Sequence, residues 1–158
     1  GSRVKLSDLK RVHEGEFAPG SESQTVTLAA PAKGRYFALE SQSAHDGKPY
    51  AAIAEIALLD AAGQSVSAEG WTIAGVDSEE RAKEDGSAEN AIDGQTANFW
   101  HTRWSDAQPS HPHHLTLDLG RTVEIGGFRY TPRQGAQGAG GRIKAYRVYV
   151  GDGAKAKE

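Results

Sequence analysis

The sequence contains no cysteine and no methionine. The absence of cysteine excludes disulfides, cysteine nucleophiles and thiolate metal sites. The chain also lacks a signal peptide and any apolar run of membrane-spanning length, so we expect no insertion into a membrane. Because it starts with Gly-Ser and has no methionine, we expect it to be trimmed from a longer protein, with residues 1–3 as a remnant.

Clustered positive charge is lacking as well. The net charge is −3, and the lysine and arginine residues are scattered along the chain. Nucleic acid is therefore not an expected partner, because its phosphate backbone requires a basic patch. A hydrophobic content of 37% is sufficient for a folded core, and a length of 158 residues predicts a single domain over residues 4–158.

No long segment shows the 3.6-residue periodicity of an amphipathic helix. Residues 4–13 have apolar side chains at helical spacing over too short a span, and we predict irregular structure there with at most one turn. Residues 51–60 are compatible with a helix by propensity, but Pro49 before them and an Ala-Ala-Gly turn after them favour a strand. The other short alternating segments that predict strands are 25–28, 35–40, 71–76, 114–119, 123–130 and 145–150.

These short strands, joined by turn-rich loops, predict an all-β fold, an antiparallel β-sandwich or jelly roll. Gly126 and Gly127 interrupt the segment 123–130. They predict a bulge or a close approach by another backbone.

Residues 87–104 contain the densest group of candidate binding residues. Residues 88–92 predict a single helical turn, and Asp93-Gly94 predicts a chain reversal because glycine tolerates a positive φ. The segment FWHTRW at 99–104 then alternates aromatic faces with hydrogen-bonding groups, an arrangement that suits sugars. Side-chain oxygens that can hold a hard cation such as Ca²⁺ come from Asn90, Asp93, Gln95, Thr96 and Asn98.

Seven motifs together resemble a known family. They are GRYFALE (34–40), YAAIAEIALL (50–59), ENAIDG (89–94), FWHTRW (99–104), HPHHLTLDLG (111–120), GFRYTPRQ (127–134) and GGRIKAYRVYVGDG (140–153). In combination they resemble the family 32 carbohydrate-binding modules of the coagulation-factor type C, or discoidin-like, superfamily. The resemblance implies a β-sandwich with a structural calcium beside the Asp-Gly turn and a site for galactose-type sugars in loops at one end. It also implies a covalently linked catalytic domain and a secreted or cell-surface bacterial protein.

The order of the motifs departs from that family. There, the segments similar to 34–40 and 50–59 come last, after the segment similar to 146–153, whereas here they come first. Joining the end of the chain to its start would restore the usual order. The sequence therefore predicts a circular permutation, or a cut across a tandem array, with adjacent termini and shared sheets.

The resemblance also assigns a sugar site. Arg133 and His101 would hydrogen-bond vicinal hydroxyls, Glu79 or Glu80 would accept from another, and Tyr50 or Trp104 would stack on the ring. Where the family often has an asparagine, this chain has Gly140, which removes one sugar-binding amide. The alternatives are a surface salt bridge from Arg133 to Glu79 or Asp77, and core positions for Trp100, Tyr130 and Tyr146.

The resemblance also assigns a calcium site, whose ligands here carry fewer negative charges than in the family. Asp93 and Glu55 match the family's ligands, while Gln95 and Asn98 stand where aspartate and threonine are usual, and Asn90 lies beside them. Affinity should be lower, because it depends on the charge of the ligands. The histidines at 111–114 form only a weak zinc pattern.

No segment resembles a nucleophile elbow or a metal-hydrolase motif. We therefore expect no enzymatic activity. The sequence favours a glycan-binding module that targets a larger glycan-degrading enzyme, with binding to galactose or N-acetylgalactosamine. The alternative is a structural or protein-interaction spacer with a decayed sugar site, and lipid binding ranks third.

Overall fold

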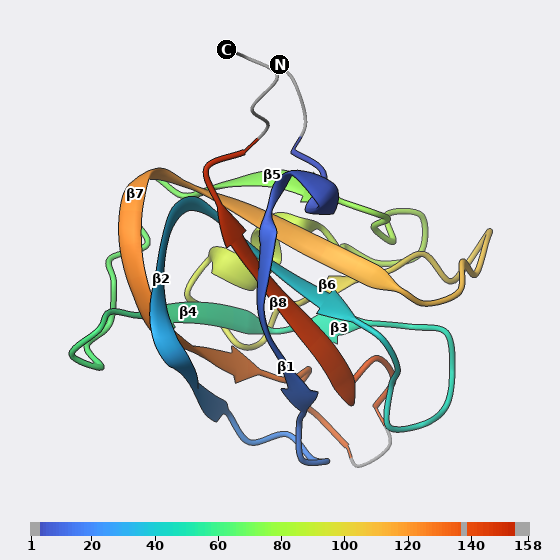
Figure 1. Cartoon of the computed structure of the whole chain (residues 1–158). Coiled ribbons are helices and arrows are strands. Elements are labelled where there is room, and N and C mark those ends of the chain that lie inside the picture. Colours follow the sequence, from blue (N-terminus) through green and yellow to red (C-terminus); the bar gives the residue numbers. More distant parts are fainter. Residues whose placement is uncertain (1–3, 137–138, 154–158) are drawn as a thin grey trace.

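The computed structural model describes residues 4–136 and 139–153. Regular structure in these residues is almost entirely strand, and their two short 3₁₀ helices are too short to cross a membrane. In chain order the elements are η1 (Leu6–Asp8), β1 (Lys10–Glu16), β2 (Gln24–Ser41), β3 (Ala52–Ile53), β4 (Glu55–Leu59), β5 (Thr72–Val76), η2 (Ala88–Ile92), β6 (Trp100–His101), β7 (His113–Thr131) and β8 (Ala145–Gly151) (Figure 1).

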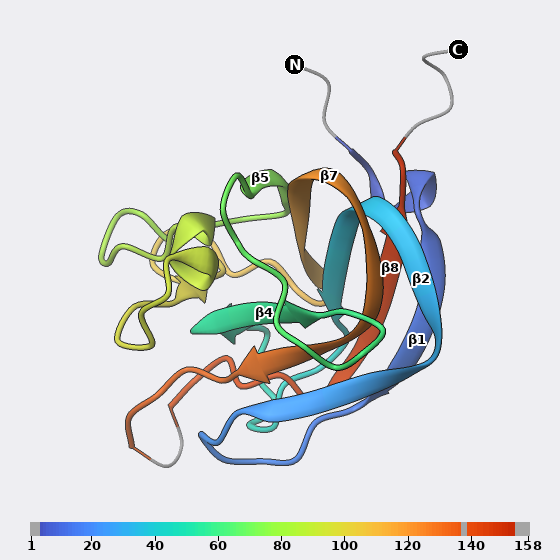
Figure 2. The same ribbon diagram turned by 90° about the vertical axis from the view of Figure 1, so that its left-hand side faces the viewer.

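Two long strands, β2 and β7, pair antiparallel and run through both layers of a β-sandwich (Figure 2). The second half of β2 pairs with the first half of β7, and β8 and β1 extend this layer on one side while β5 extends it on the other. The first half of β2 pairs with the second half of β7, beside which lies β4. Strands β3 and β6 form a separate short pair. The predicted all-β sandwich is confirmed.

Both long strands bend where their register is interrupted. In β2, pairing with β7 is lost between Thr27 and Ala32, a stretch that contains Pro31, which has no amide hydrogen to donate. In β7, a second interruption contains Gly120, whose φ of +76° is a left-handed conformation that favours glycine. These interruptions let each strand leave one layer and enter the other.

Two predicted strand boundaries are therefore wrong. Segments 25–28 and 35–40 are parts of β2, and segments 114–119 and 123–130 are parts of β7. Local turn signals such as Pro31 imply a break, but the neighbouring strand provides hydrogen-bond partners on both sides of it. The ladder thus continues in a new direction.

The prediction of irregular structure for residues 4–13 is also wrong in its second half. Only η1 fits it, and from Lys10 onward the chain pairs with β8, with Lys10 opposite Val150. Strand β1 is mostly exposed or half-buried and carries charged side chains, as an edge strand should. It forms because β8 offers a free edge, which local sequence does not reveal.

The remaining strand predictions are confirmed, except that one predicted strand is divided into two. Residues 51–60 form β3 and β4, and the chain passes at Ala54 from the pair with β6 to the pair with β7. The close approach expected at the two glycines is also observed. A Cβ on Gly127 would collide with the carbonyl oxygen of Val26, and a Cβ on Gly126 with that of Asp60.

The two ends of the described chain lie side by side. Strand β1 pairs with β8, and a Cβ added to Gly151 would lie 3.1 Å from Cδ2 of Leu9. Strand β2, from the N-terminal third, pairs with both β7 and β8. This is the geometry expected of a permuted or rejoined chain. The permutation itself stays a prediction.

Aromatic rings form the centre of the core. Phe17 stacks between two tyrosines, with ring centroids 4.0 Å from Tyr146 and 4.2 Å from Tyr130. The Tyr130 hydroxyl accepts a hydrogen bond of 3.0 Å from the amide of Ile143. Trp100 is buried, and the predicted core positions of Trp100, Tyr130 and Tyr146 are confirmed.

The close approach of β2 and β7 predicts the effect of a single methyl group. Gly127→Ala should lower the free energy of unfolding by about 1–3 kcal/mol, because its Cβ forces the two backbones apart. Gly140→Ala is the matched control, since a Cβ there meets nothing closer than 3.7 Å. Urea unfolding followed by tryptophan fluorescence measures both. Equal stabilities would contradict the role of the glycine.

Candidate ligand-binding site

Three chain segments meet at one edge of the sandwich because of strand register. Ser41, at the end of β2, lies opposite both His113 at the start of β7 and Tyr146 near the start of β8. The loops that follow β2 and precede β7 and β8 therefore start from the same edge. Together with the loop before η2 they form a pocket, which is lined by Asp46, Lys48, Tyr50, Glu84, His101, Trp104, Arg133 and Gly140.

Four of the predicted sugar-site residues are in this pocket: Tyr50, His101, Trp104 and Arg133. Tyr50 and His101 lie at a ring-centroid distance of 5.6 Å, with planes tilted by 46°. The amide of Ala51 donates to the Thr102 hydroxyl at 3.1 Å, which ties the two segments together. The sequence thus predicted residues that tertiary structure brings to one place.

His101 is a neutral hydrogen-bond acceptor toward the pocket. Its side chain is buried, and Nδ1 lies 2.6 Å from the carbonyl oxygen of Thr102, to which it must donate. Burial lowers the pKa of His101, and the nearby charge of Arg133 lowers it further. The neutral ring with its proton on Nδ1 has a lone pair on Nε2.

Arg133 is held by an aromatic face rather than by an acid. Its guanidinium carbon lies 4.5 Å from the ring centroid of Phe99, and Nη1 donates to the carbonyl oxygen of Gly140 at 3.3 Å. The alternative of a salt bridge to Glu79 or Asp77 is not observed, because these pair with Arg81 and His113. Phe99 was not predicted as a site residue, although it belongs to the FWHTRW motif.

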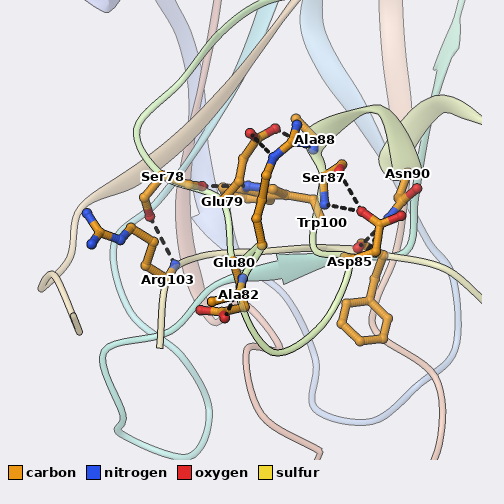
Figure 3. Close-up of polar contacts among 12 residues, drawn as sticks. Ser78, Glu79, Glu80, Ala82, Asp85, Ser87, Ala88, Asn90, Trp100 and Arg103 are labelled. Carbon is orange, nitrogen blue, oxygen red and sulfur yellow. Dashed lines mark hydrogen bonds and ion pairs between the residues drawn. The ribbon is translucent and has the colours of Figure 1, made fainter. Parts of the chain in front are cut away.

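The two predicted acids of the site lie elsewhere, around the loop that leads to η2 (Figure 3). Glu79 accepts from the amide of Ala88 at 2.8 Å and pairs with Arg81. Glu80 is buried and accepts hydrogen bonds from the backbone amides of Ala82, Lys83, Trp104 and Ser105 and from the Ser105 hydroxyl. Neither lines the pocket, so their expected contact with a sugar has no support in the geometry.

The acid that lines the pocket from this segment is Glu84. Its Oε2 accepts from Nε1 of Trp104 at 2.9 Å, so the carboxylate holds the indole ring in place. The acidic run 77–85 marks this segment in the sequence, but spacing along the run does not show which carboxylate turns inward. That choice depends on the hydrogen bonds that hold Glu79 and Glu80 elsewhere.

The pocket is also lined by two polar residues, Asp46 and Lys48, which sequence reasoning missed. The amide of Lys48 donates to Oδ1 of Asp46 at 2.9 Å, which closes a tight turn. A Cβ on Gly140 would lie 3.7 Å from Oδ2 of Asp46 and 3.9 Å from both Arg133 and Tyr50. The glycine therefore leaves open space between these three side chains, where the family's asparagine would project.

The predicted calcium ligands lie around the Asp93 turn. Glu55 Oε2 accepts from the amide of Gly94 at 2.9 Å, while Oε1 is buried without a hydrogen-bond partner. Burial raises the pKa of Glu55 to about 7, and the negative charge of Asp93 adds to this shift. Asn98 donates to Oδ2 of Asp93 at 2.9 Å.

The other two predicted calcium ligands are Asn90 and Gln95. Asn90 uses its amide nitrogen on the carbonyl oxygens of Asp85 and Phe99. Gln95 is exposed, and its backbone amide donates to Oδ1 of Asp93. The carboxylates of Glu55 and Asp93 lie close together, and Oε1 of Glu55 is buried without a partner. This arrangement nevertheless fits a cation, which would neutralise the two like charges.

Fold and pocket together define a β-sandwich binding domain whose site is built from loops. The family model of the F5/8 type C domain matches residues 74–156, just over half of the chain. The chain belongs to the F5/8 type C family, and the discoidin-like fold that its motifs indicated is confirmed.

Several curated proteins contain similar sequence. A sialidase from Micromonospora viridifaciens is 47% identical over 96 residues, which cover 60% of this chain and 13% of the sialidase. A galactose oxidase from Gibberella zeae is 30% identical over 112 residues, 69% of this chain and 16% of the oxidase. An A type blood N-acetyl-α-D-galactosamine deacetylase from Flavonifractor plautii is 34% identical over 66 residues, 42% of this chain and 8% of the deacetylase. The chain thus matches only a small part of each relative.

The contacts of Glu80 predict how the fold responds to acid. Burial opposes ionisation, but the Ser105 hydroxyl and three backbone amides outweigh it and lower the pKa of Glu80 from 4.5 to about 2. Ionised Glu80 therefore stabilises the fold above pH 4.5, and this contribution is lost as the pH falls toward 2.

Glu80→Gln should accordingly melt at a lower temperature than wild type at pH 7, and the gap should narrow between pH 4.5 and 2. The exposed Glu89→Gln in η2 is the charge-matched control and should follow wild type. Melting temperatures measured from pH 2 to 7 are the test. A constant gap between Glu80→Gln and wild type at every pH would contradict it.

Proposed function

We propose that this chain is a non-catalytic glycan-binding module for galactose-type or N-acetylgalactosamine-type sugars. The observation that carries the proposal is the convergence of Tyr50, His101, Trp104 and Arg133, from separate segments, on one pocket. Aromatic faces and fixed polar groups in one pocket match the two surfaces of a sugar, its C–H face and its hydroxyls.

Five of the pocket residues have a definite task in this proposal. The neutral His101 presents Nε2 as an acceptor for a sugar hydroxyl, while Arg133 presents guanidinium N–H donors. Glu84 takes the part of the acid that was expected of Glu79 or Glu80. Tyr50 or Trp104 packs on the sugar ring. Donors and acceptors side by side favour a ligand with neighbouring hydroxyls, each of which can donate and accept.

The relatives support a carbohydrate ligand. The sialidase, the galactose oxidase and the N-acetyl-α-D-galactosamine deacetylase are all named for sugar substrates, and each carries a segment similar to this chain. We extend this to a parent protein in which the module is covalently linked to a glycan-active catalytic domain and is secreted or held at the bacterial cell surface.

Calcium is part of the proposal as a structural ion at the Asp93 turn. Glu55 and Asp93 would provide the charged ligands, with Asn98 in contact with Asp93 and with Asn90, Gln95 and oxygens of the turn as further candidate ligands. The ion would supply positive charge that relieves the repulsion between the two carboxylates. It would fix the turn between η2 and the FWHTRW segment.

The sugar proposal predicts losses of affinity in defined variants. Arg133→Ala, His101→Ala and Tyr50→Ala should each weaken binding of galactose or N-acetylgalactosamine and leave the fold intact. Arg133→Ala should cost most, about 1.5–3 kcal/mol, because it removes charge-assisted hydrogen bonds. Titration calorimetry measures this, with wild-type affinity expected in roughly the micromolar to millimolar range.

Arg121→Ala is the control for these variants, because Arg121 is exposed in the bend of β7 and does not line the pocket. It should bind as wild type does. If neither galactose, N-acetylgalactosamine nor mucin-type glycans bind wild type at millimolar concentration, the spacer function replaces the glycan-binding one. The same holds if all three pocket variants bind as well as wild type.

The calcium proposal predicts a change in thermal stability. Calcium at 100 times its dissociation constant should stabilise the fold by about 2.7 kcal/mol, and EDTA should reverse the gain. Glu55→Gln should abolish the response without lowering the calcium-free melting temperature, because it removes a like charge facing Asp93. The exposed Glu69→Gln is the control. A wild-type melt that EDTA and calcium leave unchanged would refute the site.

A further inference from the structure

We propose that the buried His113 and its partially exposed partner Asp77 form a positioning pair for the ligand pocket, which works only while His113 carries two protons. The pair holds the carbonyl group of Pro49, and with it the segment 46–50 that provides Asp46, Lys48 and Tyr50 to the pocket. The inference rests on the proposed function in taking this pocket as the ligand site.

The protonation of His113 follows from its hydrogen-bond partners. Its side chain is 0% exposed, with Nδ1 2.7 Å from Oδ2 of Asp77 and Nε2 2.6 Å from the carbonyl oxygen of Pro49. A carboxylate and a carbonyl group only accept hydrogen bonds. Both ring nitrogens must therefore donate, and the ring that satisfies both contacts is the imidazolium cation.

The charges around His113 agree with this assignment. Burial acts to lower the pKa of His113, but the hydrogen bonds to Asp77 and Pro49 and the charge of Asp77 outweigh it and raise the pKa above 6.5. The ring of His111 lies 4.7 Å away, and burial lowers its own pKa, so it does not carry a competing charge at neutral pH. The Pro109 carbonyl group also faces His113 and favours the cation.

The contact with Pro49 matters because proline has no amide hydrogen. Its carbonyl oxygen is the only backbone group through which Pro49 can be hydrogen-bonded, and His113 occupies it. The next residue is Tyr50, whose ring faces His101. On the other side, the turn of Asp46 and Lys48 is closed by its own local hydrogen bond. His113 thus anchors the segment between that turn and the tyrosine.

Loss of one proton from His113 places a nitrogen lone pair against an oxygen lone pair, at either Asp77 or Pro49. Because the folded pKa is raised, the anchored state is fully present below pH 6.5 and is lost as the pH rises through that higher pKa. The expected result is a pocket that weakens toward alkaline pH. His101, which is already neutral, does not produce this dependence.

Asp77→Asn is the sharpest test, because the two oxygens of Asp77 have different partners. Oδ1 accepts from the amide of His114 at 2.7 Å, and the oxygen of the new amide can keep that contact. Its NH₂ group would then face Nδ1 of His113 and donate to it. A neutral ring with its proton on Nε2 satisfies both partners, so Pro49 stays anchored at every pH. Asp106→Asn, an exposed residue paired with Arg103, is the charge-matched control.

Two measurements decide the proposal. Nitrogen-15 spectra of the ring should show both nitrogens of His113 protonated at pH 6 in wild type, with a titration midpoint above 6.5. The backbone amides of Lys48 and Tyr50 should shift with the same midpoint. Asp77→Asn should show a ring with one proton and flat amide shifts, while Asp106→Asn should behave as wild type. With galactose as probe, wild-type affinity should fall several-fold across the midpoint, and that of Asp77→Asn should not.

A neutral His113 in wild type at pH 6 would overturn the proposal. So would amides of Lys48 and Tyr50 that do not follow its titration, or an Asp77→Asn variant that keeps the wild-type pH profile. If galactose fails to bind at any pH, the proposed function fails, whereas the spectra still decide whether the pair positions the segment.

Discussion

The antiparallel pairing of β2 with β7 is the interaction on which the rest of the structure depends. Because both strands bend between the two layers, a single hydrogen-bonded ladder joins the halves of the sandwich, and β8, β5 and β4 each add to it. The same register places the end of β2 opposite the starts of β7 and β8. The loops at this edge therefore come together before any of their side chains interact.

The loops themselves contain little regular structure, and side-chain hydrogen bonds hold them instead. Glu80 accepts hydrogen bonds from backbone amides of its own loop and of Trp104 and Ser105. His113 and Asp77 connect the start of β7 to the loop after β2. These polar contacts position the pocket walls, and the lowered pKa of Glu80 and the raised pKa of His113 make them sensitive to pH.

The pocket combines a neutral acceptor, a cation on an aromatic face and a carboxylate that fixes an indole ring. This combination suits recognition of hydroxyl groups, because His101 is oriented by its bond to the Thr102 carbonyl and Arg133 forms no ion pair with the acids of the described residues. Gly140 distinguishes this pocket from the pattern of family 32 modules. It leaves open space beside Asp46, so under the proposed function the two sites should differ in which sugar substituents they accept.

Alternation in the sequence determined the fold class and most strands, and the resemblance of the YAAIAEIALL, FWHTRW and PRQ motifs to a known family identified four pocket residues, because these are local signals. The sequence by itself did not reveal that β2 and β7 are continuous, or that residues 10–16 form a strand, because these depend on an adjacent strand edge. It could not distinguish Glu84 from Glu79 and Glu80, since which carboxylate faces the pocket depends on which amides lie near the other two. Only the tertiary structure decided the burial of His101 and the ring partners of His113, because burial depends on the packing of distant segments and the partners of His113, Asp77 and Pro49, are 36 and 64 residues away in the chain.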